Sequence, residues 1–129
     1  MSSRPTSRKA ARRQALFLLY QWDLTGQELA SLFEGEPDDF ARTLAEAVAS
    51  RAGGLDGRIS AASPDWPADR LGTLERNILR IGVFELEEET VPREVAINEA
   101  VVLAKRYATE DAARLVNGIL GQIAREEAA

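Results

Sequence analysis

The stretch from Val91 to Ala124 reads VPREVAINEAVVLAKRYATEDAARLVNGILGQIA, and it decides the class of fold. Its apolar residues recur three and four positions apart, which is the period of a helix buried along one side. Pro92 suits the start of a helix that reaches about Tyr107, and Thr109 can cap a second helix. The predicted core positions are Ala96, Ala100, Leu103 and Tyr107 on the first helix, and Ala112, Val116, Ile119 and Ile123 on the second.

The same spacing continues toward the N-terminus, where alternating strand-like patterns are nearly absent. The sequence therefore predicts an all-α domain. Gly53-Gly54 is expected to weaken or kink one of its helices, because each glycine costs about 1 kcal/mol in a helix. Residues 63–67, SPDWP, are predicted to be a turn and the place of any boundary between subdomains. The further helices are predicted over residues 7–24, 27–33, 37–62 and 68–89.

The composition of the chain argues against several classes of function. The chain has 129 residues, which is the length of one domain, so we expect a single domain over residues 1–129. It contains no Cys and no His, and it therefore lacks the commonest nucleophiles, general bases and metal ligands. We expect neither an enzyme nor a bound metal or cofactor. No apolar run approaches about 18 residues, so we expect no membrane contact and a cytoplasmic location.

Charge is distributed unevenly along the chain. The first 22 residues carry five cations and no acid, whereas the remainder carries 21 acids against 11 cations. A basic arm on an acidic body suggests an anionic partner, and a solubilising tail is an equally good interpretation from charge alone. We expect residues 1–6 of this arm to be flexible.

The first helix carries the most informative surface. Lys9, Arg13 and Tyr20 share one of its faces, and the apolar residues lie roughly opposite. Cations neutralise phosphates and an aromatic ring stacks on an unpaired base, which fits single-stranded RNA. The alternative is that Tyr20 borders the core and the cations are merely solvated; spacing alone favours this alternative.

Two further features stay open on sequence grounds. Gly118 and Gly121 lie inside the last helix, where we favour close helix packing over close approach of a ligand as their reason. Asn117 beside them has no assigned role at this level. The acidic run Glu85, Glu87, Glu88 and Glu89 is either a solvated helix end or a contact surface for a basic protein.

Three segments resemble the NusB family of transcription antitermination factors. They are RKAARRQALFLLYQWDLT at residues 8–25, DWPADRLGTLERNILRIGVFEL at residues 65–86, and the stretch at residues 91–124 quoted above. The resemblance spans about residues 7–124 and is weakest over residues 26–62. It implies two packed three-helix subdomains with an additional helix.

The resemblance also implies partners. They are a single-stranded boxA RNA element near the start of ribosomal RNA transcripts, and NusE, a small-subunit ribosomal protein. Both would act within an RNA polymerase complex that resists termination. The RNA contacts implied are Arg8, Lys9, Arg12, Arg13, Tyr20, Glu75, Asp111, Arg114 and Asn117. The partner contacts implied are Arg76, Arg80, Phe84, Glu85 and Glu88.

Two positions depart from the family pattern, and two rival functions remain. Leu115 stands where the family often has Phe, and Phe84 replaces a frequent Tyr. NusB-like domains also occur fused to RNA methyltransferases, but those enzymes need a cysteine and a cofactor domain that this chain lacks. The other rival is a helical adaptor or homodimer that does not bind RNA, so the chain is expected to be a monomer or a homodimer.

Overall fold

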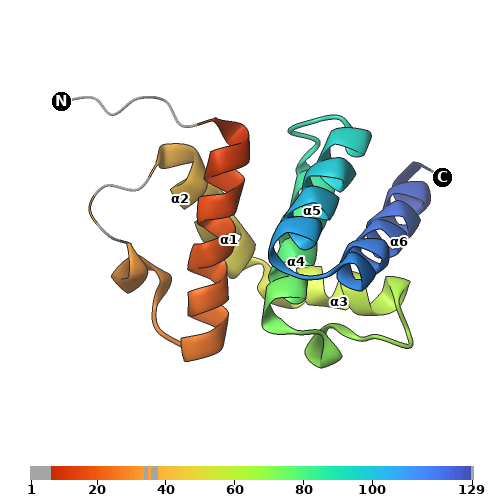
Figure 1. Cartoon of the computed structure of the whole chain (residues 1–129), viewed down its shortest axis with the longest axis horizontal. Coiled ribbons are helices and arrows are strands. Elements are labelled where there is room, and N and C mark those ends of the chain that lie inside the picture. The colour runs from red at the N-terminus through yellow and green to blue at the C-terminus, as the bar shows by residue number, and fades with distance from the viewer. Residues whose placement is uncertain (1–6, 34, 36–37, 129) are drawn as a thin grey trace.

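The computed structural model describes residues 7–33, 35 and 38–128, and the regular structure in these ranges is entirely helical. The predicted all-α class is therefore confirmed. The flexible segment expected at residues 1–6 and the helix start expected at Pro37 lie outside the described residues. The helices are α1 (Arg8–Thr25), η1 (Leu29–Leu32), α2 (Asp39–Ser50), α3 (Ala52–Ala62), η2 (Ala68–Arg70), α4 (Thr73–Glu88), α5 (Arg93–Tyr107) and α6 (Glu110–Ala128) (Figure 1).

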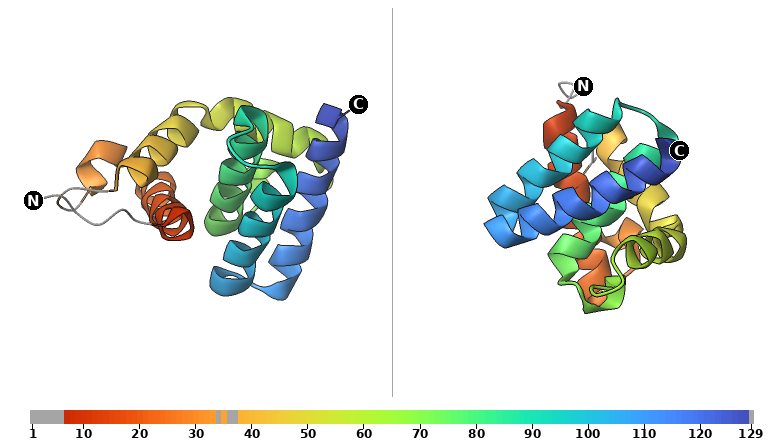
Figure 2. Two further views of the ribbon diagram at one scale, coloured as in Figure 1. Left: turned by 90° about the horizontal axis from the view of Figure 1, so that it is seen from above. Right: turned by 90° about the vertical axis from the view of Figure 1, so that its right-hand side faces the viewer.

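Helices α1 and α2 pack together with the short 3-10 helix η1, helices α4, α5 and α6 form a bundle, and α3 packs mainly against α4 and α6. Helix α1 packs against α2 and α4, and α4 packs against α5 and α6. Figures 1 and 2 show α1 and α2 on one side of the molecule and the α4–α6 bundle on the other. Because α3 packs against α4 and α6 as well as α2, a subdomain boundary at residues 63–67 stays a prediction.

Helix ends follow the local sequence. The Ser7 hydroxyl accepts a hydrogen bond from the Ala10 N–H at 3.1 Å, and the Thr109 hydroxyl accepts one from the Ala112 N–H at 2.9 Å. Gly26 ends α1 with a φ of 73°, a left-handed conformation that glycine adopts without strain. These three predicted caps are confirmed, because a cap depends only on residues within one turn of it.

The break between α2 and α3 was predicted at the wrong residues. The chain breaks at Arg51, whose N–H is shared between the carbonyl oxygens of Ala47 and Val48, both at 3.2 Å. Gly53 and Gly54 lie inside α3. Val48 on α2 and Leu55 on α3 are buried in the core on the two sides of this break.

Packing was also wrongly predicted as the reason for Gly118 and Gly121. Gly118 is exposed and a Cβ there would meet no atom within 4 Å, while at Gly121 it would meet only the Arg125 guanidinium at 3.4 Å. The glycine that permits close packing is Gly82 on α4. A Cβ at Gly82 would lie 2.6 Å from Cδ1 of the fully buried Leu120, so α4 and α6 approach across this residue.

The core runs through both sets of helices. Its largest fully buried side chains come from five of the six α-helices, and α4 contributes more of them than any other helix. No helix in the described ranges is long and apolar enough to cross a membrane. The fully buried large residues are Leu16, Leu19, Val48, Leu55, Ile59, Ile78, Leu79, Ile81, Val83, Leu86, Leu120 and Ile123.

Candidate nucleic-acid interface

Helix α1 presents a continuous exposed strip along its length. Because α1 is unbroken from Arg8 to Thr25, Lys9, Arg13 and Tyr20 lie on one face as expected. The Lys9 side chain is 73% exposed, and Arg13 and Tyr20 are half-buried. Phe17, which is 43% exposed, lies between them along the helix. We call these four residues the α1 strip.

Helix α5 extends the α1 strip. Lys9 pairs with Glu99 of α5 at 3.6 Å, and two turns further along, Phe17 meets Tyr107 edge to face with 5.0 Å between ring centroids. Side chains of the two helices therefore touch at two places, eight residues apart along each helix. The Arg106 guanidinium lies 5.5 Å from the Tyr107 ring centroid, beside the exposed Lys105.

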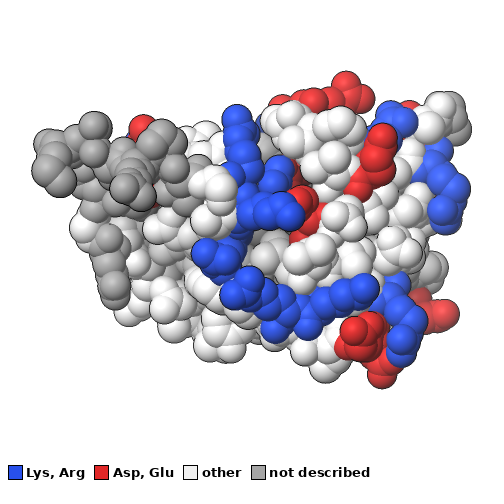
Figure 3. Space-filling view, turned by 45° about the horizontal axis from the view of Figure 1, so that its top comes forward, with Lys and Arg blue, Asp and Glu red and all other residues white. Residues whose placement is uncertain are grey.

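On the face of the molecule that carries the α1 strip, the positively charged side chains form a band. Figure 3 shows Lys and Arg side chains following α1 and then turning across the lower part of the face. Arg8 stands near its start, where its guanidinium covers the Phe40 ring at 4.1 Å. Lys and Arg dominate this face although the whole chain carries a net charge of −5.

Arg12 does not belong to the α1 strip. It is only 3% exposed, and its Nε and Nη2 atoms donate to the Glu85 carboxylate at 2.9 and 2.8 Å. Glu85 is equally buried. As surface contacts to RNA and to a protein partner, Arg12 and Glu85 therefore do not fit the structure. They instead join α1 to α4 beneath the strip.

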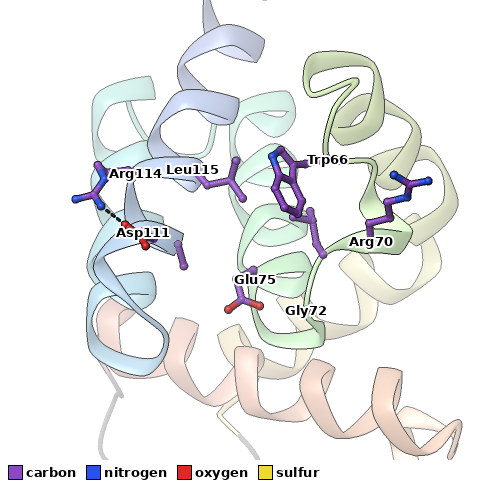
Figure 4. A pocket seen from close by; sticks show the side chains of 9 residues that line it. Trp66, Arg70, Gly72, Glu75, Asp111, Arg114 and Leu115 are labelled. Atoms are coloured by element: carbon purple, nitrogen blue, oxygen red, sulfur yellow. Dashed lines mark hydrogen bonds and ion pairs between the residues drawn. The ribbon is translucent and has the colours of Figure 1, made fainter.

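A groove opens where α6 begins, next to the turn before η2. Its volume is about 830 Å³. It brings together Glu75, Asp111 and Arg114, which are separated in the sequence and were all expected to contact RNA. Figure 4 shows Trp66 and Leu115 on opposite sides of the opening, with Glu75 below them. The lining residues are Trp66, Arg70, Leu71, Gly72, Glu75, Asp111, Ala112, Arg114 and Leu115.

Two local contacts determine where the charged side chains of the groove lie. A Cβ at Gly72 would overlap the Glu75 carboxylate, so the absence of a side chain at Gly72 lets Glu75 fold back over the start of α4. Asp111 and Arg114, one turn apart on α6, form an exposed ion pair. The Glu75 carboxylate therefore lies beside Gly72 in the groove, while Asp111 and Arg114 are held only by a pair that water screens.

Asn117 lies outside this groove. It is exposed on α6 beside the exposed Gly118, and α6 places both on the same side as Arg114. The surface around Gly118 is open, so close helix packing does not explain that glycine.

The residues expected at the partner surface are mostly engaged within the chain. Asp23 of α1 accepts hydrogen bonds from Arg76, Asn77 and Arg80, each at 3.0 Å. Arg80 also donates to Asp56 at 2.7 Å through Nε. Burial opposes the charge of Arg80, but the hydrogen bond and charge of Asp56, together with those of Asp23, hold its pKa above the ordinary value.

Arg51 at the α2–α3 bend and Arg58 within α3 neutralise the acidic end of α4. Arg51 pairs with Glu88 and covers the Phe84 ring at 5.0 Å, and Arg58 bridges Glu87 and Glu127 at 2.6 and 2.7 Å. These hydrogen bonds raise the pKa of Arg58. Of the residues expected at the partner surface, Phe84 and Glu88 keep partial exposure through this network. The acidic run is therefore internally paired.

Sequence reasoning missed four residues of this face. Trp66 was taken only as part of a turn, and Tyr107 only as a core residue. Phe17 and Arg106 had no assigned role. Trp66, Arg106 and Tyr107 share one signal, an aromatic or cationic side chain at a helix end or in a turn, whereas Phe17 lies within α1. Only tertiary packing brings Phe17 to Tyr107. Within the described ranges, no group of three or more His, Cys, Asp or Glu residues is placed to hold a metal ion.

Comparison with known proteins identifies relatives over nearly the whole chain. The sequence profile of the NusB family matches residues 9–125. A transcription antitermination protein NusB from Rubrobacter xylanophilus is 40% identical over 121 residues, covering 88% of this chain and 87% of the relative. The NusB protein of Myxococcus xanthus is 36% identical, covering 92% and 94%.

Solved structures agree. A chain in the crystal structure of the antitermination factors NusB and NusE in complex with double-stranded RNA superposes with a TM-score of 0.82 at 32% identity, covering 92% of this chain and 96% of that one. NusB from T. maritima superposes with a TM-score of 0.84 at 31% identity, covering 95% and 94%. These relatives are described as antitermination factors and not as enzymes, as composition led us to expect.

Proposed function

This chain belongs to the NusB family of transcription antitermination proteins, and we propose that it binds single-stranded boxA RNA of ribosomal RNA transcripts together with NusE. The bound pair would join an RNA polymerase complex that resists termination, in the cytoplasm. The observation that carries this proposal is the α1 strip, which continues through Tyr107 and Arg106 of α5 on an otherwise acidic chain.

The chemistry of the strip fits a nucleic-acid strand. Lys9 and Arg13 supply positive charge for phosphates, and the release of counterions from the nucleic acid favours such contacts. Phe17, Tyr20 and Tyr107 supply rings at the same surface, which can stack on bases. Arg12 is left out of the proposed contacts because its guanidinium is buried on Glu85.

A single strand is favoured over a duplex by the same features. Rings stack on bases only when those bases are unpaired, and a duplex offers mainly its backbone. The neighbouring NusB–NusE structure is described with double-stranded RNA, so the two forms must be compared directly. We expect tighter binding of a single-stranded boxA RNA than of the same sequence annealed to its complement.

NusE is proposed to dock beside the RNA. Three of the expected partner residues, Arg76, Phe84 and Glu88, retain exposure, and Arg51 contacts the last two. If NusE extends the RNA surface, RNA and NusE must each increase the affinity for the other by the same factor. Titration of labelled boxA RNA with and without NusE measures that factor.

The decisive experiment replaces Lys9 and Arg13 by Ala together. We expect weaker RNA binding and a salt dependence, log K against log salt, that is shallower by about 1.4, since each phosphate contact to a single strand contributes about 0.7. The matched control is Arg42→Ala with Arg125→Ala, which removes two exposed cations from α2 and the end of α6. Equal affinity and slope for the Lys9/Arg13 variant and the control would sink the proposal.

Self-association through this face is the second candidate. Phe17 is 43% exposed on α1, and Val95 and Val102 are 37% and 41% exposed on α5. Apolar side chains on neighbouring helices favour a protein contact. Light scattering at increasing protein concentration, with and without boxA RNA, distinguishes RNA binding from self-association. A dimer that RNA does not dissociate, and that does not bind RNA, would favour the helical adaptor or homodimer.

A further inference from the structure

We propose that Trp66 forms a stacking wall of the groove at the start of α6, which Glu75 and Leu115 also line. We propose further that this groove holds one unpaired nucleobase with N–H donors on its pairing edge, and that it binds guanine most tightly. The inference rests on the proposed RNA-binding function and adds to it a residue and a base preference. It follows from the ring, the groove and the carboxylates that the fold places together.

The Trp66 ring is available for stacking. At 54% exposure it is one of the two most exposed large apolar side chains in the described part of the chain. Arginines cover the rings of Phe40, Trp22 and Phe84, at 4.1, 5.8 and 5.0 Å, which leaves less room for a base. No such contact is found for Trp66 among the described residues. A large ring left open to solvent at the edge of a groove suits a flat apolar ligand.

The opposite wall has the matching shape. Leu115 faces Trp66 across the opening, and Leu71 and Ala112 add to the apolar lining (Figure 4). A base inserted between Trp66 and Leu115 would have a ring on one face and an aliphatic side chain on the other. Trp66 therefore supplies the aromatic surface that Leu115 does not.

The charged side chains around the groove determine which part of a nucleotide can enter it. Glu75 and Asp111 place carboxylates in the groove, and these repel a phosphate. Arg70 and Arg114 point away from the opening on its two outer sides, where the backbone on either side of an inserted base would pass (Figure 4). The base therefore points inward and its phosphates stay outside.

Carboxylates also select among bases. An ionised carboxylate only accepts hydrogen bonds, so it needs N–H donors from the base. Guanine presents two neighbouring donors, N1–H and N2–H, which one carboxylate accepts as a pair. Cytosine and adenine offer only an amino group on this edge, and uracil offers one N–H between two carbonyl oxygens that the carboxylates repel. Guanine is therefore expected to bind best and uracil worst.

The test compares two nonamers, one of uridines alone and one with a single central guanosine. The guanosine nonamer should bind the unaltered chain more tightly and should quench tryptophan emission. Trp66→Phe should abolish most of the quenching, because Trp22 then remains as the only tryptophan, but should keep most of the affinity. Trp66→Ala should weaken binding of the guanosine nonamer about 5- to 100-fold, as expected for loss of one stacked base.

A separate double variant tests the preference of the groove for guanine over uracil. Glu75→Gln with Asp111→Asn should bring the two nonamers to similar affinity, since an amide matches the edge of guanine less well than a carboxylate. Equal binding of both nonamers by the unaltered chain, or an unchanged affinity in Trp66→Ala, would overturn this inference. If Lys9→Ala with Arg13→Ala still weakens binding in that case, the proposed function stands. If the unaltered chain binds no RNA, with or without NusE, the proposed function itself fails.

Discussion

Arg12 and Glu85 lie 73 residues apart in the sequence, and in the structure they form a two-pronged ion pair whose side chains are each 4% exposed. The pair joins α1 to α4 under the α1 strip. Arg13, the next residue along α1, is half-buried and belongs to the α1 strip. Consecutive arginines thus have different roles, one in holding the helices together and one at the surface.

Breaking this pair from one side should be severe. Arg12→Met alone, or Glu85→Met alone, leaves the other charge buried without a partner and should lower the free energy of unfolding by about 3–5 kcal/mol. The double variant removes both charges and should recover most of that loss. Urea denaturation of the three variants measures the coupling, and additive losses in the double variant would contradict the expected role.

Gly82 and Gly118 should respond in opposite ways to alanine. Gly82→Ala forces a methyl group against the buried Leu120 and should cost about 1–3 kcal/mol. Gly118→Ala meets no neighbour on an exposed helix face and should stabilise by about 0.5–1 kcal/mol. Thermal unfolding separates the two. A stabilised Gly82→Ala would show that α4 and α6 are less closely packed than described.

Glu89 ends α4 with a φ of 53°, a conformation that glycine adopts more readily than other residues. Glu89→Gly should therefore stabilise the chain by about 0.5–1 kcal/mol, because its 3.9 Å pair with Arg93 is exposed and contributes little. The control is Glu88→Gly at the last residue of α4, which loses helix propensity and the Arg51 pair and should destabilise. Denaturant midpoints of equal value for the two variants would argue against strain at Glu89.

Arg80→Lys tests the polar network between the helices. A lysine cannot donate to Asp56 and Asp23 in the same forked geometry, so we expect a loss of about 1–3 kcal/mol. The raised pKa of Arg80 means that its stabilising effect is complete below its unfolded-state value and disappears only as the pH rises through the folded-state value. Lysine ionises lower, so the variant should also lose stability at a lower alkaline pH.

A matched control for that network is Arg42→Lys. Arg42 pairs with Asp39 at an exposed site on α2, and its replacement should change the free energy of unfolding by less than about 0.5 kcal/mol. Unfolding curves recorded from neutral to alkaline pH provide both comparisons. If Arg80→Lys matched Arg42→Lys at every pH, the network would be dispensable.

The sequence by itself determined what depends on neighbours within a few turns. The caps at Ser7 and Thr109, the helical class and the shared face of Lys9, Arg13 and Tyr20 all follow from spacing along one helix. Local geometry fixes which residues share a face, because the helix repeat does not depend on what packs against it. The family resemblance grouped Arg12 with the RNA contacts, and the sequence alone did not show that Arg12 is buried.

Only the tertiary structure decided which faces are covered. Arg12 is buried because Glu85 arrives from a helix distant in the sequence, and Gly82 matters because Leu120 lies over it. Trp66 becomes a wall of a groove because α6 places Leu115, Asp111 and Arg114 beside its turn. These are contacts between segments far apart along the chain, and a periodic pattern in one segment carries no information about which side chain the other segment brings to it.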